Sequence, residues 1–142
     1  MKKTLLILLF CTNLFFGQYT LIPDPVFEQN LINKQLDNDG LNGQVLTSNI
    51  SSITQLSLTS LSGGFALIYN LQGIEGFMAL EKLELTGNDG GLSSISITNN
   101  FNLKELLFYG NYLNNLVVSA PLLEKLVVEN PIPLLQTLDI SN

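Results

Sequence analysis

The chain lacks most of the side chains on which enzyme chemistry depends. It has no histidine, no tryptophan and no arginine, and its single cysteine is Cys11, near the start of the 142 residues. Without these groups a Ser-His-Asp or Cys-His arrangement cannot be built, and zinc has no imidazole ligand. Paired carboxylates remain, but Glu81 and Glu84 imply no cleft of the kind a glycosidase needs. We therefore expect no enzyme activity, no catalytic residue, no cofactor and no metal site.

Positive charge is scarce. Six lysines stand against 12 acidic residues, and two of the lysines, Lys2 and Lys3, lie in the first segment. The rest of the chain has four lysines and 12 acidic residues, a net charge of −8. Four scattered lysines cannot form the basic stripe that a phosphate backbone requires, so nucleic acid is excluded as a partner.

Residues 1–17 have the layout of a secretory signal peptide. A short positive start precedes an apolar run over residues 5–16, which is shorter than the roughly 20 residues that span a bilayer. We expect cleavage near Gly17, a secreted or cell-surface protein, and no membrane insertion after signal removal. A lipoprotein acceptor at Cys11 is the alternative, but Phe10 stands where such signals place a small residue. About 125 residues remain, which is enough for one domain.

One phrase, L-x-x-L-x-L with Ile, Val or Phe allowed for Leu, recurs from the middle of the chain to its end. Its seven occurrences start at Ile53, Leu80, Leu92, Leu103, Leu113, Leu123 and Leu135. Alternate residues of a strand point to one face, so each phrase predicts a short strand that sends its apolar residues into one core. Asparagines expected to bond backbone groups inside the following turns are Asn88, Asn100, Asn111 and Asn142.

This pattern resembles the leucine-rich repeat family, in particular secreted bacterial proteins that carry the phrase twice in each repeat of about 21 residues. The resemblance covers about residues 22–142. It includes residues 71–80, similar to a phrase that precedes the first regular repeat, and residues 22–48, similar to a capping segment. The resemblance implies a mainly β leucine-rich repeat solenoid with short parallel strands and an N-terminal capping helix, used to present a binding surface outside the cell.

The expected organisation has three parts: a signal peptide over 1–17, an N-terminal capping segment over 18–52 and about four repeats over 53–142. A helix is predicted over about 25–36, with Asp24 as N-cap and Pro25 in its first turn. The C-terminal end has no capping helix, which indicates a fragment of a longer protein. An end covered by a partner, with self-association through the exposed C-terminal repeat, is the alternative.

Two glycine-containing segments are weighed as binding loops. Residues 37–43 have the composition of a calcium loop but lack the EF-hand residues at its fifth, sixth and twelfth positions, so a turn is favoured. Residues 87–91 lack the lysine and the following helix of a phosphate-binding loop, and we interpret them as a turn as well.

Stacked strands would display columns of outward residues. The columns of the first strands read Gln55, Lys82, Glu105, Lys125; Ser57, Glu84, Leu107, Val127; and Thr59, Thr86, Tyr109, Glu129. Apolar groups occur here where a solvated face would be polar, which favours a contact patch, although the same residues also suit any β-strand. The candidate partner-contact residues are Glu84, Leu107, Tyr109, Val127 and Glu129. The second strands display small polar residues and are expected to form a solvated back.

The function that these patterns predict is an extracellular or cell-surface binding module whose strand face contacts a protein or glycan. The alternative is a structural spacer, or the truncated N-terminal part of a larger surface protein whose functional domain lies beyond Asn142. The sequence leaves two roles for the loop over residues 62–69. Phe65 and Tyr69 either pack under the first repeat or project as recognition groups.

Overall fold

The computed structural model describes residues 18–61, 66–129 and 135–141. The predicted signal peptide over 1–17, Phe65 and Asn142 lie outside these residues. Within them the chain is mainly β, as predicted, and its principal sheets are parallel.

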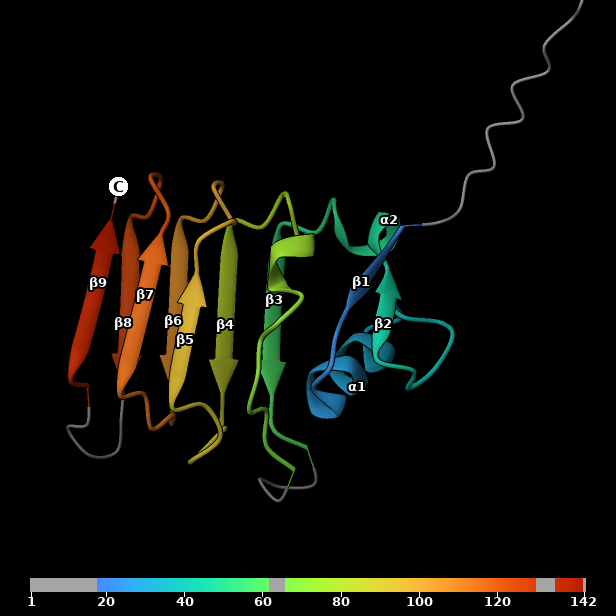
Figure 1. The fold of residues 1–142 in the computed structure, drawn as a ribbon, viewed down its shortest axis with the longest axis horizontal. Coiled ribbons are helices and arrows are strands. Elements are labelled where there is room, and N and C mark those ends of the chain that lie inside the picture. Colours follow the sequence, from blue (N-terminus) through green and yellow to red (C-terminus); the bar gives the residue numbers. More distant parts are fainter. Residues whose placement is uncertain (1–17, 62–65, 130–134, 142) are drawn as a thin grey trace, which may run out of the picture.

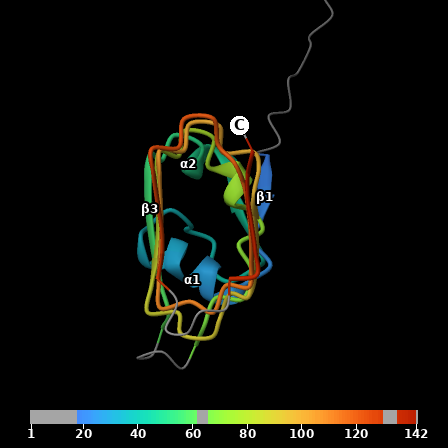
Figure 2. The ribbon, with the colours of Figure 1, turned by 90° about the vertical axis from the view of Figure 1, so that its left-hand side faces the viewer.

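Seven strands form two parallel sheets. The first sheet has the order β3-β4-β6-β8 and the second the order β5-β7-β9. Their bounds are β3 Gln55–Thr59, β4 Lys82–Thr86, β5 Ser94–Ile97, β6 Glu105–Tyr109, β7 Asn115–Ser119, β8 Lys125–Glu129 and β9 Thr137–Ser141. The strands of each sheet lie in a row (Figure 1), and in the end view the sheets face each other while successive turns of the chain superpose (Figure 2). Each of the seven phrases coincides with one strand, which confirms the predicted strands.

The register of the first sheet is the predicted one. Lys82 pairs with Gln55 and Glu105, and Glu105 also pairs with Lys125, so the first column is continuous across four strands. The alternate residues point between the sheets, where side chains such as Leu83, Leu106 and Phe108 are fully buried. The period of two in the phrases therefore separates core from surface in this sheet.

The predicted helix is α1, Pro25–Asn33, and Asp24 caps its start. The Asp24 Oδ1 atom accepts the backbone N–H groups of Val26 at 3.0 Å and Phe27 at 2.9 Å. The helix ends three residues before the predicted end at Leu36, which is a correction. Gln35 adopts a left-handed φ of 60°, and the N–H of Leu36 donates to Leu31 O in the bonding pattern of a Schellman motif. Glycine usually occupies that position, so the sequence carried no signal for this end.

Helix α1 covers the free edge of β3. The ring of Phe27 stacks on Phe77 with centroids 6.3 Å apart. Asn30 donates from Nδ2 to Thr59 O at 2.9 Å and accepts the Thr59 N–H at 3.2 Å, so a side chain takes the place of a neighbouring strand there. The capping segment also contains an antiparallel pair and a short helix, namely β1 Tyr19–Leu21, β2 Gln44–Leu46 and α2 Thr47–Ile50. A 3-10 helix, η2 Ile74–Gly76, precedes β4.

The loop over residues 37–43 closes on a buried carboxylate. Glu28 Oε1 accepts the backbone N–H groups of Asn42 at 2.8 Å, Gly43 at 2.7 Å and Gln44 at 3.2 Å. These three bonds fasten the end of the loop to α1, which agrees with the turn that the sequence favoured. In the described part of the chain no three carboxylate, imidazole or thiol groups are placed so that they could hold a metal ion.

Inward-facing asparagines close the turns after the strands, as predicted. Asn88 Nδ2 donates to Ile68 O at 2.8 Å and to Asn111 Oδ1 at 3.2 Å, and Asn88 Oδ1 accepts the Ile68 N–H at 2.7 Å. Asn100 Nδ2 donates to the carbonyl oxygens of Ile74 and Phe77. All three asparagines are buried, so they satisfy backbone groups that water does not reach.

The glycines of residues 87–91 allow that turn to form. Gly90 has a φ of +87°, and a Cβ atom at Gly91 would lie 2.4 Å from the carbonyl oxygen of Ile68. The segment is a turn, as we interpreted it, and the close approach of the backbone explains why a side chain is not accommodated at Gly91.

Asp37 is a buried carboxyl group with one unpaired oxygen. Its side chain is 2% exposed, Oδ1 accepts the N–H of Asp39 at 3.2 Å, and Oδ2 has no hydrogen-bond partner. Burial raises the pKa of Asp37 above its ordinary value, and the charges of Asp39 and Glu28 raise it further. The folded state therefore holds the Asp37 proton more tightly than the unfolded state does.

Asp37→Asn is expected to raise the melting temperature at pH 7. Because the folded-state pKa is raised, the wild type carries an unfavourable charge at neutral pH and loses that penalty as the pH falls through the folded-state pKa. The difference between variant and wild type should disappear below about pH 4. Thermal melting by circular dichroism at pH 7 and pH 3.5 checks this, with Asp139→Asn as the exposed control. A variant less stable than wild type at pH 7, or a gain independent of pH, would contradict it.

Candidate functional site

The outward face of the first sheet brings the five predicted contact residues together. Glu84, Leu107 and Val127 hold one register position in β4, β6 and β8, and Tyr109 pairs with Glu129 at the next outward position. We call these five residues the strand-face patch. The sequence therefore predicted correctly which residues become neighbours.

Leu107 does not offer the exposed contact that the sequence predicted. It is 3% exposed, although it lies on the outward side of the sheet and outside the core cluster. The physical reason is its central place: Glu84 and Val127 lie directly beside it in the strands on either side. This part of the prediction is wrong, and the apolar surface that the patch presents comes from Tyr109 and Val127, which are half-buried.

Two charged residues of this face form an ion pair within one strand. Lys82 Nζ lies 3.4 Å from Glu84 Oε2, two positions further along β4 and on the same side of the sheet. We expected Lys82 and Lys125 to flank Glu105, and the register confirms that placement. The Lys82 ammonium is carried on a flexible stem, which lets it reach Glu84 within its own strand. Glu129, at the other end of the patch, is exposed.

A hollow of about 280 Å³ opens beside the patch, where the end of α1 meets β3 and β4. Its lining residues are Lys34, Gln55, Leu56, Ser57, Lys82 and Glu84. They supply two ammonium groups, an amide, a hydroxyl and a carboxylate, so the hollow can both donate hydrogen bonds to a polar ligand and accept them. Sequence reasoning did not find Lys34, because only the packing of α1 against the sheet brings it to this face.

Two further expectations concern other surfaces. On the second sheet Ser94 and Ser96 are exposed, as expected of a solvated back, while Val117 is half-buried. Tyr69, which the sequence left open, projects and is 66% exposed. Phe65 lies outside the described residues.

A comparison with protein-family models gives no match, and no curated protein matches the chain. Among the residues described, no helix combines the length and apolar character needed to cross a membrane.

Proposed function

We propose that the chain is a leucine-rich repeat solenoid exported to the cell surface or the medium, where it acts as a binding module. Two observations support the solenoid: the seven phrases coincide with seven strands, and successive turns of the chain superpose in the end view (Figure 2). The signal-like residues 1–17 support export.

The observation that carries the binding role is the composition of the strand-face patch and the hollow beside it. Tyr109 and Val127 present apolar surface on a solvent-facing side of the sheet, Glu129 pairs with Tyr109, and Glu84 and the lining of the hollow supply polar groups on the side of β3 and β4. An apolar centre with a polar rim is the usual anatomy of a recognition surface, and tyrosine is enriched among the residues that dominate binding energy. The partner is a protein or a glycan, and the net charge of −8 of residues 18–142, four lysines against 12 acidic residues, disfavours nucleic acid.

A second candidate function is a structural spacer within a larger surface protein. The observation that favours it is on β9, where Leu138 and Ile140 are 49% and 44% exposed. Apolar side chains of this size at the end of a stacked array suit contact with further repeats or with a second copy of the chain.

Tyr109→Ala tests the binding role. We expect the affinity for a partner, found by probing glycan arrays and cell-surface proteins with the labelled chain, to fall about fivefold or more, because truncation removes a half-buried aromatic contact. Binding is measured by isothermal titration calorimetry and folding by thermal melting. Ser96→Ala, on the second sheet, is the matched control and should bind like wild type. Full affinity in both Tyr109→Ala and Glu84→Lys would move the site elsewhere.

A further inference from the structure

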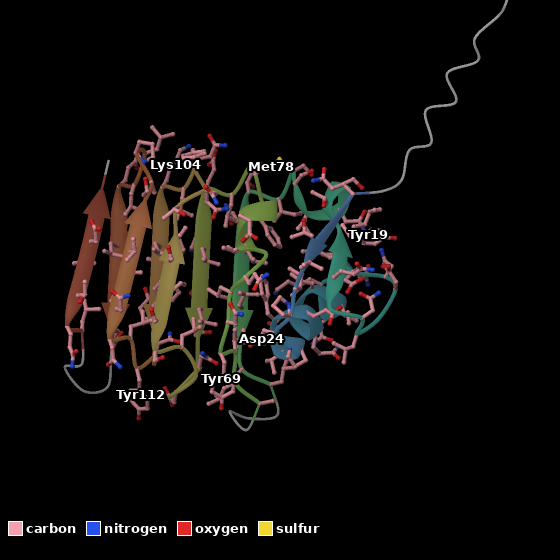
Figure 3. The ribbon with its side chains drawn as sticks, viewed as in Figure 1. Tyr19, Asp24, Tyr69, Met78, Lys104 and Tyr112 are labelled. Carbon is pink, nitrogen blue, oxygen red and sulfur yellow. The ribbon has the colours of Figure 1, made fainter. Side chains whose placement is uncertain are left out.

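Two exposed tyrosines lie at one edge of the molecule, in turns beyond the strand ends that carry Tyr109 and Glu129. Tyr69 is 66% exposed and Tyr112 is 36% exposed. Both lie at the edge where the strands of the first sheet end, and both point away from the sheets (Figure 3). Asp89, also exposed, lies on the turn after β4, as Tyr112 lies on the turn after β6. We call Tyr69, Asp89 and Tyr112 the edge triad.

The members of the edge triad occupy three consecutive turns of the structure. Tyr69, Asp89 and Tyr112 come directly after Ile68, Asn88 and Asn111, respectively. Hydrogen bonds join these three preceding residues in a row. Asn88 bonds to both of its neighbours in this row, so the order of the turns is fixed. Neighbouring strands are about 4.8 Å apart, which places the turns that carry the two tyrosines roughly 10 Å from each other, with the turn of Asp89 between them. The Asp89 carboxylate lies against Gly110, in the turn that carries Tyr112.

Contacts with the rest of the protein fix the backbone at Tyr69 and the ring of Tyr112. Asp24 Oδ2 accepts the N–H groups of Tyr69 at 2.8 Å and Asn70 at 3.1 Å. The ring of Tyr112 lies over Gly90, where a Cβ atom would be 3.1 Å from two ring carbons. Groups that are already ordered lose little conformational entropy when a ligand binds, so the backbone at Tyr69 and the ring of Tyr112 are preorganised.

The charge at this edge indicates what kind of ligand it accepts. Neither ion pair found among the described residues involves Asp89, so its carboxylate is left to accept hydrogen bonds and repels an anionic ligand. Tyrosine rings offer apolar faces with a polar hydroxyl at one end. Sugar rings combine an apolar C–H face with hydroxyl donors, which fits two aromatic faces separated by an acceptor.

We propose that the edge triad is a second binding site and that its ligand is a neutral, extended β-linked glycan. One sugar ring packs on Tyr69, a second packs on Tyr112, and a hydroxyl of the intervening unit donates to Asp89. The separation of the tyrosines suits alternate units of an extended chain and does not suit a tightly coiled one. A peptide is less well matched, because the residues that the structure describes at this edge form turns and offer no open strand along which a peptide backbone could pair. The site is built from turns beyond the strand ends and uses none of the residues of the strand-face patch, so it goes beyond the proposed function.

The test titrates the secreted chain with neutral hexasaccharides of β-1,4-linked glucose, xylose and N-acetylglucosamine by isothermal titration calorimetry. We expect at least one of them to bind, and Tyr69→Ala and Tyr112→Ala each to weaken that binding about tenfold, the usual effect of removing an aromatic anchor. Tyr19→Ala, an exposed tyrosine on β1, is the matched control and should leave the affinity unchanged. Asp89→Asn should raise the relative affinity for an oligogalacturonate, because it removes the repelling charge.

Several outcomes would overturn this inference. It fails if no neutral β-linked hexasaccharide binds, if binding survives the Tyr69→Ala/Tyr112→Ala double variant, or if an α-linked glucose hexamer, an anionic oligosaccharide or an extended peptide binds the wild type more tightly. Thermal melting of each variant shows that the fold is intact. Tyr109→Ala separates the two proposals: if it abolishes oligosaccharide binding while the edge variants do not, the glycan sits on the strand-face patch and only the present inference falls.

Discussion

Leu106→Asp is expected to unfold the protein at 25 °C. Leu106 is fully buried between the two sheets and is the second residue of β6. A carboxylate there loses its hydration without gaining a partner, and the apolar packing of leucine is lost as well. Together these effects cost about 5 kcal/mol or more, which is comparable with the whole free energy of unfolding of a typical domain. Far-UV circular dichroism and thermal melting measure the loss.

The same substitution one residue later is the matched control. Leu107 is almost as inaccessible as Leu106, but it lies on the outward side of the sheet, where an aspartate can turn towards water. Leu107→Asp should cost about 2 kcal/mol, the value of burying one leucine side chain, and should stay folded. Wild-type melting of Leu106→Asp, or equal loss in the two variants, would show that the division between core and surface is wrong.

Asn88→Ala is expected to destabilise the fold by about 3 kcal/mol or more. Asn88 is fully buried and bonds to the N–H and the carbonyl of Ile68 and to Asn111. Alanine leaves these partners unpaired away from water, and each unsatisfied buried group costs about 1–3 kcal/mol. Urea denaturation gives the change in the free energy of unfolding.

Two other asparagines serve as comparisons for the Asn88→Ala variant. Asn99 is exposed and should tolerate alanine within about 0.5 kcal/mol. Asn111 donates to Tyr109 O at 3.3 Å and accepts from Asn88, so Asn111→Ala should be intermediate. If the asparagines were merely turn formers, alanine at Asn88 and at Asn99 would cost the same.

The strands could be predicted because each one is determined by residues that are close together in the sequence. In each phrase the apolar residues alternate, and a one-residue slip would expose them all, so residues such as Leu83 and Leu85 fix both the strand and its register. The capped start of α1 was predictable for the same reason, since Asp24 and Pro25 act within one turn of helix.

What the sequence did not reveal depends on contacts between distant segments. The end of α1 is set by a left-handed Gln35, a residue with no special preference for that conformation. The burial of Leu107 follows from the side chains of two neighbouring strands, and the place of Lys34 follows from how a helix docks on the sheet. Alternation shows which way a side chain points, but it does not show what covers that side chain.

The cap over β3 gives the molecule two unlike ends. At β3 the edge is covered by α1, and Asn30 occupies both backbone groups of Thr59. At β8 the core residues Leu126 and Val128 are only half-buried. Each strand gains most of its stability from the strands beside it, so local unfolding costs more near the capped end. Among the described strands, resistance to local unfolding is therefore expected to rise from β8 towards β3.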